Sequence, residues 1–90
     1  MERKISEVRY GNIFLKHAFR LPKKIIKKAG EKEQAFKENA FHPTLHTHKL
    51  HGKEQGSWAF WIDYDYRIKF IFLSENEVLF LDIGTHNIYK

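Results

Sequence analysis

Cysteine is absent from the chain, and proline and methionine are scarce, with two and one residues respectively. Without cysteine the protein has no disulfide framework and no thiolate metal site, which suits a reducing cytoplasm. No apolar run approaches the roughly 20 residues that a membrane helix needs, and the opening MERKISEVRY lacks the apolar segment of a secretory signal. The sequence therefore predicts a cytoplasmic protein without membrane association.

The composition favours one packed domain, residues 1–90. Hydrophobic residues make up 42% of the chain and aromatic residues 16%, while 30% of the residues are charged. A mixture of this kind supports a folded core rather than disorder. Ninety residues suffice for one modest core and are too few for two independently stable domains.

The charge balance is basic. Lys and Arg number 16 against 11 Asp and Glu, which gives a formal net charge of +5. A small basic domain attracts polyanions, nucleic acid above all, through counterion release and electrostatic steering. The alternative is that the charge serves solubility alone.

An early strand and two helices are predicted before residue 41. The stretch from Ile5 to Tyr10 has the composition of a strand, and Gly11-Asn12 then supplies turn chemistry. Pro22 disfavours helical geometry in the residue before it and suits the first turn of a new helix, so the two helices should meet at a bend. Apolar residues recur at helical spacing in both segments: Ile13, Phe14, Ala18 and Leu21 in the first, and Ile25, Ala29, Phe36 and Ala40 in the second.

Lysines gather on the other sides of the second predicted helix. They offer a surface for RNA or for an acidic partner, and the alternative is an ordinary solvated outer face. The five residues are Lys23, Lys24, Lys27, Lys28 and Lys32.

The last third of the chain predicts three antiparallel strands. The segments SWAFWIDY, YRIKFIFL and EVLFLDIG are rich in aromatic and branched residues, and short turn sequences at 63–65 and 74–76 separate them. We therefore expect an α+β fold in which an N-terminal strand and two helices precede a three-stranded antiparallel meander. The helices should cover one face of that sheet.

Alternation along the middle strand assigns its faces. Tyr66, Ile68, Phe70 and Phe72 should face the helices. The other face then carries an acid and two bases in a row, which makes it a candidate anion groove on an open, solvated surface; the alternative is a cross-strand ladder of salt bridges. The residues of this second face are Asp65, Arg67, Lys69 and Ile71.

A polar, histidine-rich connection spans residues 41–56, with a short extended piece expected at 48–50. Long irregular connections tend to be functional. Imidazole is a common zinc or nickel ligand, but the spacing of these histidines fits no standard zinc motif, and we expect neither a metal nor another cofactor. The alternatives are contacts to RNA or plain surface chemistry. The histidines are His42, His46, His48 and His51.

The second half of the chain resembles the RelE/ParE superfamily of toxins from bacterial toxin–antitoxin systems, and the YafQ-like members most. The pieces that carry the resemblance are HKLHG, the pattern W-x-F-x-I-x-x-x-Y-R-I, and D-I-G-T-H followed by an aromatic residue. The order of strand, helix, helix and meander is also that of the family. The resemblance implies a ribosome-dependent endoribonuclease that cuts mRNA in the ribosomal A site, against the 16S rRNA of the 30S subunit, and is neutralised by a cognate antitoxin.

Site residues carry over from the resemblance one by one. His86 in GTH matches the histidine proposed as general acid or base, His48 in HKLHG matches a loop histidine, and Asp65 matches an aspartate at the start of a strand. Arg67 matches the arginine that RelE-like members direct at the phosphate. These four are the predicted catalytic residues. The residues expected to contact RNA are Lys49, His51, Lys53, Lys69 and the near-terminal aromatic Tyr89.

Trp61 departs from the family pattern, because YafQ-like toxins carry a further histidine there. The departure leaves His86 paired with either Asp65 or His48. RNA cleavage through the 2′-OH needs a base, an acid and a cation but no metal, and imidazole and guanidinium are suited to these tasks. Small neighbours at 84 and 85 would leave His86 open to substrate; alternatively this histidine only caps the strand.

Two further functions stay open at this point. One is a ParE-like toxin that inhibits gyrase through protein contact on the same scaffold. The other is a degenerate, non-catalytic member that binds only RNA or an antitoxin, which the tryptophan at position 61 keeps in view.

Overall fold

The computed structural model, which describes residues 2–52 and 56–89, has the predicted α+β order of elements. It also has a two-residue strand at His48–Lys49, within the stretch 48–50 that was expected to be extended. The elements are β1 (Glu7–Tyr10), α1 (Asn12–Ala18), α2 (Lys23–Glu38), the 3-10 helix η1 (Pro43–Leu45), β2 (His48–Lys49), β3 (Trp58–Trp61), β4 (Tyr66–Phe72), β5 (Glu77–Thr85) and the 3-10 helix η3 (His86–Tyr89).

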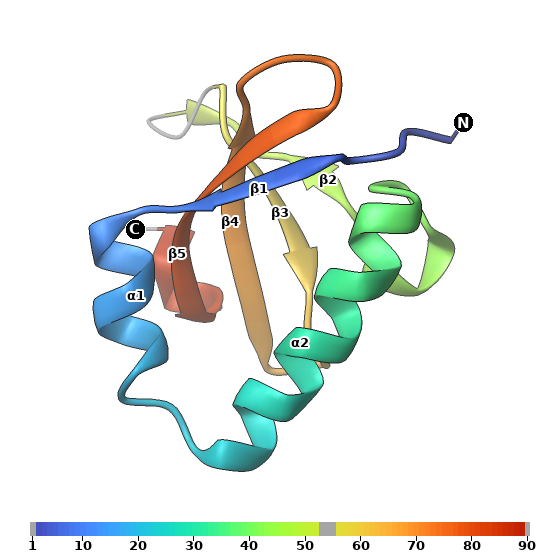
Figure 1. The fold of residues 1–90 in the computed structure, drawn as a ribbon. Coiled ribbons are helices and arrows are strands. Elements are labelled where there is room, and N and C mark those ends of the chain that lie inside the picture. The colour runs from blue at the N-terminus through green and yellow to red at the C-terminus, as the bar shows by residue number, and fades with distance from the viewer. Residues whose placement is uncertain (1, 53–55, 90) are drawn as a thin grey trace.

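The five strands form one mixed sheet in the order β1-β5-β4-β3-β2. β1 runs parallel to β5, and the three other pairs of neighbours are antiparallel, so the predicted meander is confirmed. α2 crosses in front of one face of the sheet, and α1 lies beside β5 (Figure 1). β1 pairs only with residues 77–80, which leaves the rest of that edge of β5 to α1.

Gly11 marks the point where the chain leaves the sheet for α1. Its N–H donates to the Phe80 carbonyl at 2.9 Å, and a Cβ atom at position 11 would lie only 3.1 Å from the same oxygen. A larger residue would press on the backbone of β5. Close approach here therefore depends on glycine, which also fits its turn-like position in the sequence.

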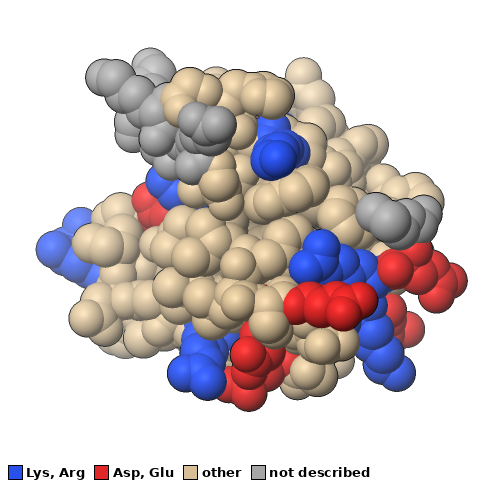
Figure 2. All heavy atoms as spheres, turned by 90° about the horizontal axis from the view of Figure 1, so that it is seen from above, with Lys and Arg blue, Asp and Glu red and all other residues tan. Residues whose placement is uncertain are grey.

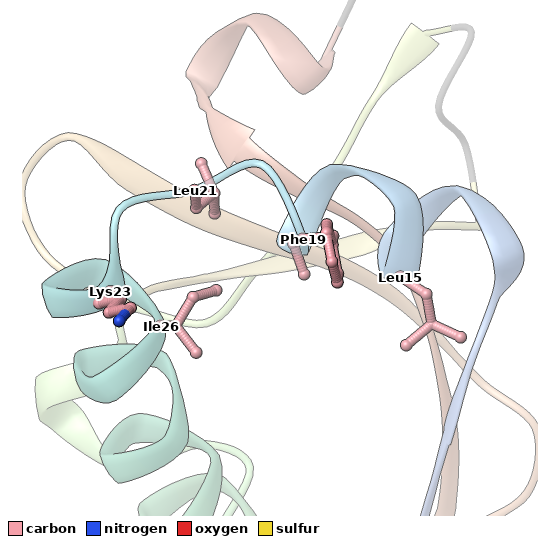
Figure 3. A pocket seen from close by; sticks show the side chains of 6 residues that line it. Leu15, Phe19, Leu21, Lys23 and Ile26 are labelled. Atoms are coloured by element: carbon pink, nitrogen blue, oxygen red, sulfur yellow. The ribbon is translucent and has the colours of Figure 1, made fainter.

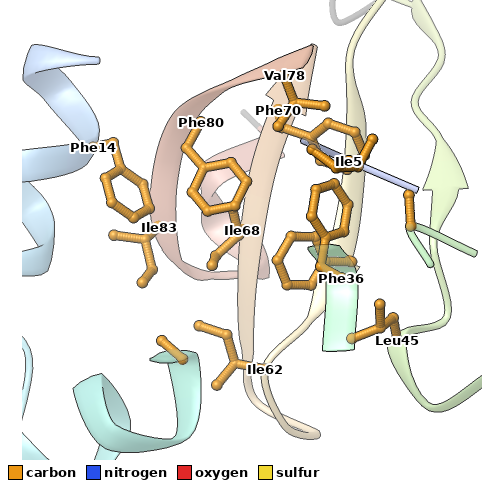
Figure 4. Close-up of a cluster of buried hydrophobic side chains, with 13 residues drawn as sticks. Ile5, Phe14, Phe36, Leu45, Ile62, Ile68, Phe70, Val78, Phe80 and Ile83 are labelled. Carbon is orange, nitrogen blue, oxygen red and sulfur yellow. The ribbon is translucent and has the colours of Figure 1, made fainter. Parts of the chain in front are cut away.

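The core fills the space between α2 and the sheet (Figure 4). Phe36 of α2 has no exposed surface and lies 4.6 Å from Phe60, 4.9 Å from Phe70 and 5.8 Å from Phe80, measured between ring centroids. Such aromatic pairs contribute beyond the area that they bury. The buried cluster comprises Ile5, Phe14, Ala29, Phe36, Ala40, Leu45, Phe60, Ile62, Ile68, Phe70, Val78, Phe80 and Ile83.

The predicted helix faces are confirmed in α2. Ile25, Ala29 and Phe36 are buried within α2, which accounts for the apolar stripe. Ala40 is also buried, but it lies beyond the end of α2 at Glu38, so the second predicted helix is too long at this residue. α1 ends at Ala18 and α2 begins after Pro22, so the helices do meet at a bend. No helix within the described ranges is both long and apolar enough to cross a membrane.

A polar contact ties β1 to α2. The Tyr10 hydroxyl donates a hydrogen bond to a Glu33 carboxylate oxygen. Burial, together with the adjacent Glu33 carboxylate, raises the pKa of Tyr10 to about 12. The phenol therefore stays protonated and keeps its donor role at neutral pH.

Phe36→Ala should strongly destabilise the fold, because it removes the ring around which three other phenylalanines pack. We expect a loss of about 3–5 kcal/mol in the free energy of unfolding, measured by urea denaturation. Phe19→Ala is the matched control, since Phe19 is 92% exposed. That variant should stay within about 0.5 kcal/mol of the unaltered chain, and equal losses in the two variants would contradict this account of the core.

Candidate active site

Three strands bring residues into one row on the face that α2 does not cover. Trp61 of β3 pairs with Arg67 of β4, and Arg67 pairs in turn with Gly84 of β5. Directly paired residues project from the same face of a sheet. Because Ile68 and Ile83 are buried in the core, the row of Trp61, Arg67 and Gly84 belongs to the opposite face.

Arg67 is mostly buried, with 8% of its surface exposed. Its guanidinium carbon lies 4.2 Å from the centroid of the Trp61 ring, and Nη1 donates hydrogen bonds to the carbonyl oxygens of Asp63 at 2.7 Å and Tyr66 at 3.1 Å. The expectation of a solvated arginine is therefore wrong, because the indole lies against its guanidinium. Within residues 2–52 and 56–89, no acidic side chain forms an ion pair with Arg67.

Asp63 organises the turn between β3 and β4. Its Oδ1 accepts hydrogen bonds from the N–H groups of Asp65 and Tyr66, both at 2.9 Å, and its Oδ2 lies 3.4 Å from Lys28 Nζ. Burial acts to raise the pKa of the Asp63 carboxyl, but the two amides and Lys28 outweigh it and hold that pKa below its ordinary value. These bonds keep Asp65 in the turn predicted at 63–65, one residue before β4, so only its assignment to the open face of the strand is wrong.

After β5 the chain folds back over the same face. η3 begins at His86, and the Ile88 carbonyl accepts a hydrogen bond from Lys69 Nζ at 3.3 Å. A Cβ atom at Gly84 would lie 2.9 Å from Ile88 Cγ2. The lack of a side chain at Gly84 therefore allows η3 to lie close to the sheet, while His86 remains exposed.

His86 and Asp65 follow the last paired residues of neighbouring strands. The β4–β5 ladder ends at the pair of Tyr66 and Thr85. The next residue outward is Asp65 on one chain segment and His86 on the other, and both are exposed. The structure thus brings three of the predicted catalytic residues, His86, Asp65 and Arg67, to one end of the β4–β5 hairpin.

His48 lies farther away across the sheet. It pairs with Ala59, which pairs with Lys69, so His48 belongs to the row next to Arg67. Its Nδ1 lies 2.9 Å from the His46 carbonyl oxygen and must carry the proton, because a carbonyl only accepts. β3 and β4 separate β2, which carries His48, from β5, which ends just before His86, so at about 4.8 Å per strand these two strands lie roughly 14 Å apart.

The residues predicted to contact RNA do not all share the face of Arg67, because Lys49 pairs with Trp58 and Trp58 pairs with Phe70 of the core. Lys49 of β2 has its Nζ 5.9 Å from the centroid of the Trp58 ring, and His51 is exposed. Lys69 is half-buried beside η3, of which Tyr89 is the last residue. Lys53 lies outside the described residues.

His46 is a neighbour of the site that the sequence offered only as one of four histidines in the 41–56 connection. Its ring centroid lies 4.0 Å from that of Trp61, so an imidazole from another segment lies against the residue that stands where the family pattern has a histidine. The pairing register of β2 and β3 is the feature that could have indicated this contact. The antiparallel pairing of His48 with Ala59, extended by two residues on each strand, sets position 46 opposite position 61.

A further histidine–carboxylate pair joins α1 to the sheet. His17 Nδ1 lies 2.6 Å from Asp82 Oδ1, and the Asp82 carboxylate also accepts the Ile83 N–H at 2.8 Å. The pair depends on α1 lying beside β5, which residue spacing does not reveal. No group of three or more His, Asp or Glu side chains in the described part of the chain is arranged to hold a metal ion.

Comparison with known proteins shows what this arrangement resembles. No family model and no curated sequence matches the chain. Among solved structures, the RelBE2 toxin–antitoxin complex of Mycobacterium tuberculosis has a TM-score of 0.79 at 14% identity, covering 94% of this chain and 97% of the other. The chain has the fold of the RelE/ParE toxins.

Two more structures share this RelE/ParE-like fold. YafQ from Escherichia coli has a TM-score of 0.75 at 16% identity and covers 90% of this chain and 93% of its own. The YoeB–YefM complex from Staphylococcus aureus has a TM-score of 0.70 at 16% identity, with 88% and 94% of the two chains covered. At this identity the likeness shows the fold, and the structures therefore confirm the fold expected from the sequence.

An apolar hollow of about 420 Å³ lies where the two helices of this RelE/ParE-like fold meet. Side chains of α1 and α2 point into it (Figure 3). Phe19 is almost fully exposed at its side, and Leu15 and Ile26 are exposed as well. An exposed apolar patch of this kind on a small protein usually marks a contact surface. The lining consists of Leu15, Ala18, Phe19, Leu21, Lys23 and Ile26.

The charges are not gathered on the face seen from above in Figure 2. Basic and acidic side chains lie side by side there, with uncharged atoms between them. On the helical side, by contrast, Lys23 lines the hollow, and Lys24 and Lys27 in the same part of α2 are exposed. The side of the hollow at the start of α2 is therefore positive.

Gly84→Ala should displace η3, because the new methyl group would meet Ile88 at less than van der Waals distance. We expect a loss of about 1 kcal/mol in stability and amide chemical-shift changes concentrated at residues 84–89. Gly30→Ala, inside α2, is the matched control: its Cβ would meet nothing within 4 Å. That variant should gain about 0.5–1 kcal/mol. Unchanged shifts of η3 in Gly84→Ala would contradict the packing described here.

Proposed function

We propose that the protein is the toxin of a type II toxin–antitoxin pair, a single domain over residues 1–90 that cleaves mRNA on the ribosome. One observation carries the proposal: β4–β5 pairing sets His86, Asp65 and Arg67 at one end of the sheet in a fold shared with YafQ, YoeB and RelE toxins. The substrate is mRNA in the ribosomal A site, bound beside 16S rRNA of the 30S subunit in the cytoplasm.

The proposed chemistry uses the nucleophile that RNA itself carries. A base takes the 2′-OH proton, the oxygen attacks the adjacent phosphorus, and an acid protonates the departing 5′-oxygen. We assign proton transfer to the exposed His86, with Asp65 as its partner. Asp65 is preferred over His48 because the end of the β4–β5 ladder places it beside His86, whereas two strands separate His48 from β5.

Arg67 supplies positive charge behind the reacting phosphate in this proposal. Its hydrogen bonds go to carbonyl oxygens and its guanidinium lies over the Trp61 ring, and among residues 2–52 and 56–89 no acidic side chain forms an ion pair with it. A fixed cation near the site stabilises the charge that develops on the phosphorane, and burial strengthens this effect. The arginine then acts at short range through its field and needs no direct contact with the phosphate.

We further propose that the antitoxin inserts an acidic amphipathic helix into the hollow between α1 and α2. The hollow accepts apolar side chains, and the exposed lysines at the start of α2 complement acidic ones. Toxin–antitoxin complexes are among the structures with this fold, including RelBE2 and YoeB–YefM. Charge complementarity favours this occupant over a second copy of the chain, which is itself basic at the start of α2.

His86→Ala should abolish growth arrest and transcript cleavage, because it removes the group assigned to proton transfer. Loss of a general acid or base typically costs 10²–10⁴-fold in rate. The measurement is primer-extension mapping of transcript ends on purified ribosomes, together with growth after induction. Since His86 is exposed, the thermal midpoint should not change.

The control for this test is His42→Ala. His42 is another exposed histidine, and its ring bonds only locally, to Thr44. The His42→Ala variant should cleave transcripts like the unaltered chain. Full activity in His86→Ala would contradict the assignment, and intact mRNA alongside broken DNA in arrested cells would point to a gyrase-directed toxin instead.

Phe19→Ala should weaken antitoxin binding without unfolding the toxin, because it removes the most exposed apolar side chain at the hollow. We expect a tenfold or greater rise in Kd, as is typical of an aromatic anchor, measured by calorimetry with the purified product of the adjacent reading frame. Leu73→Ala is the control, since Leu73 is exposed on the β4–β5 connection. Equal affinities for the unaltered chain and Phe19→Ala would exclude the hollow as the docking site.

A further inference from the structure

The Trp61 indole lies between two groups that come from opposite sides of β3. Arg67 reaches it from β4, with its guanidinium carbon 4.2 Å from the ring centroid. His46 reaches it from the segment before β2, with ring centroids 4.0 Å apart and planes at 31°. The exposure increases along this stack: Arg67 is buried, Trp61 is half-buried and His46 is exposed.

The backbone at His46 is held in an uncommon conformation. Its φ of 51° and ψ of 38° make it the one non-glycine residue with positive φ in the described part of the chain. A left-handed conformation costs a non-glycine residue of order 1 kcal/mol. Two contacts hold it in place: the His46 carbonyl accepts from the His48 ring, and its N–H donates to Pro43 at 3.4 Å.

The rings of His46, Trp61 and Tyr64 form an aromatic shelf. It lies next to the end of the sheet that carries Arg67. The His46 ring lies against Trp61, and the residue as a whole is exposed. Tyr64, which is 79% exposed, stands nearly perpendicular to the same indole with its ring centroid 6.1 Å away. Flat exposed rings beside positive charge are the elements with which proteins bind single-stranded nucleic acid.

We infer that His46, supported from behind by Trp61, stacks a nucleobase of the single-stranded RNA next to the scissile phosphate. The inference rests on the proposed function and adds a specific binding residue to it. Both the Arg67 guanidinium carbon and the His46 ring lie close to the centroid of the Trp61 ring, at 4.2 Å and 4.0 Å, so a base on His46 adds one more flat group to this set. Trp61 then serves as a support that positions the His46 ring, and Arg67 serves the reacting phosphate and the shelf at once.

The test uses two variants at position 46 and one at position 42. Each is compared with the unaltered chain in its binding of a short, mixed-sequence, single-stranded oligoribonucleotide, measured by fluorescence anisotropy. His46→Asn removes the ring but tolerates the left-handed backbone, so the fold should be retained. We expect its Kd to rise about tenfold, as for the loss of one stacked base. His46→Phe keeps a flat ring and should bind within about threefold of the unaltered chain, and His42→Asn should bind normally.

Two further readouts separate stacking from charge. The dependence of log Kd on log salt should be the same for His46→Asn and the unaltered chain, whereas loss of one contact to single-stranded phosphate would lower that slope by about 0.7. Duplex RNA should bind His46→Asn and the unaltered chain equally well, because its bases are already stacked. These comparisons use the full chain throughout.

Several results would overturn the inference: undiminished affinity in His46→Asn, equal losses in His46→Asn and His46→Phe, or no measurable binding of the oligonucleotide by the unaltered chain. Its failure can be told apart from failure of the proposed function. If the unaltered chain cleaves transcripts on ribosomes while His46→Asn binds RNA normally, only the stacking role is lost. If no transcript is cleaved, the nuclease assignment falls whatever the binding data show.

Discussion

The pairing of β4 with β5 is the constraint on which the rest of the structure depends. It buries Ile68 and Ile83 against the helices, and the same register sets Arg67 opposite Gly84 on the other face. A slip of one residue would exchange the two faces of a strand, placing a guanidinium in the apolar core. Burial of apolar residues therefore selects the register of β4 and β5. The same register aligns, on the other face, the residues to which we assign the chemistry.

The buried Arg67 shows how this face differs from an ordinary solvated surface. Burial of a charged group is costly unless its hydrogen bonds are replaced. Two carbonyl oxygens and the Trp61 ring replace them, and the charge itself is left without an acidic partner among the described residues. A carboxylate paired with Arg67 would stabilise the free protein more, but the pair would attract a phosphate less than Arg67 alone. In the proposed function, this arrangement favours an anionic ligand over the stability of the isolated chain.

Local patterns predicted the framework, whereas contacts between distant segments decided the site. Alternation along β4 gave the core face, and the spacing of Ile25, Ala29 and Phe36 gave the buried stripe of α2, because both depend on neighbours in the chain. The burial of Arg67 depends on an indole from another strand, and Asp65 leaves the strand because Asp63 binds the turn amides. The contact with the indole is not visible in residue spacing, whereas the turn at 63–65 is. His46 required the register between β2 and β3.

The two proposed binding surfaces lie on different sides of the sheet. The hollow is formed where α1 meets α2, whereas η3 and the shelf occupy the face opposite the core. A helix held in the hollow therefore leaves the end of the β4–β5 hairpin uncovered. To block the reaction, the antitoxin must either extend past the α1 side of β5 or displace η3, which among the described contacts is held by the Lys69–Ile88 hydrogen bond and the close approach of Ile88 to Gly84. Affinity and inhibition are then separate properties of the complex, because the anchor and the obstruction act at different places.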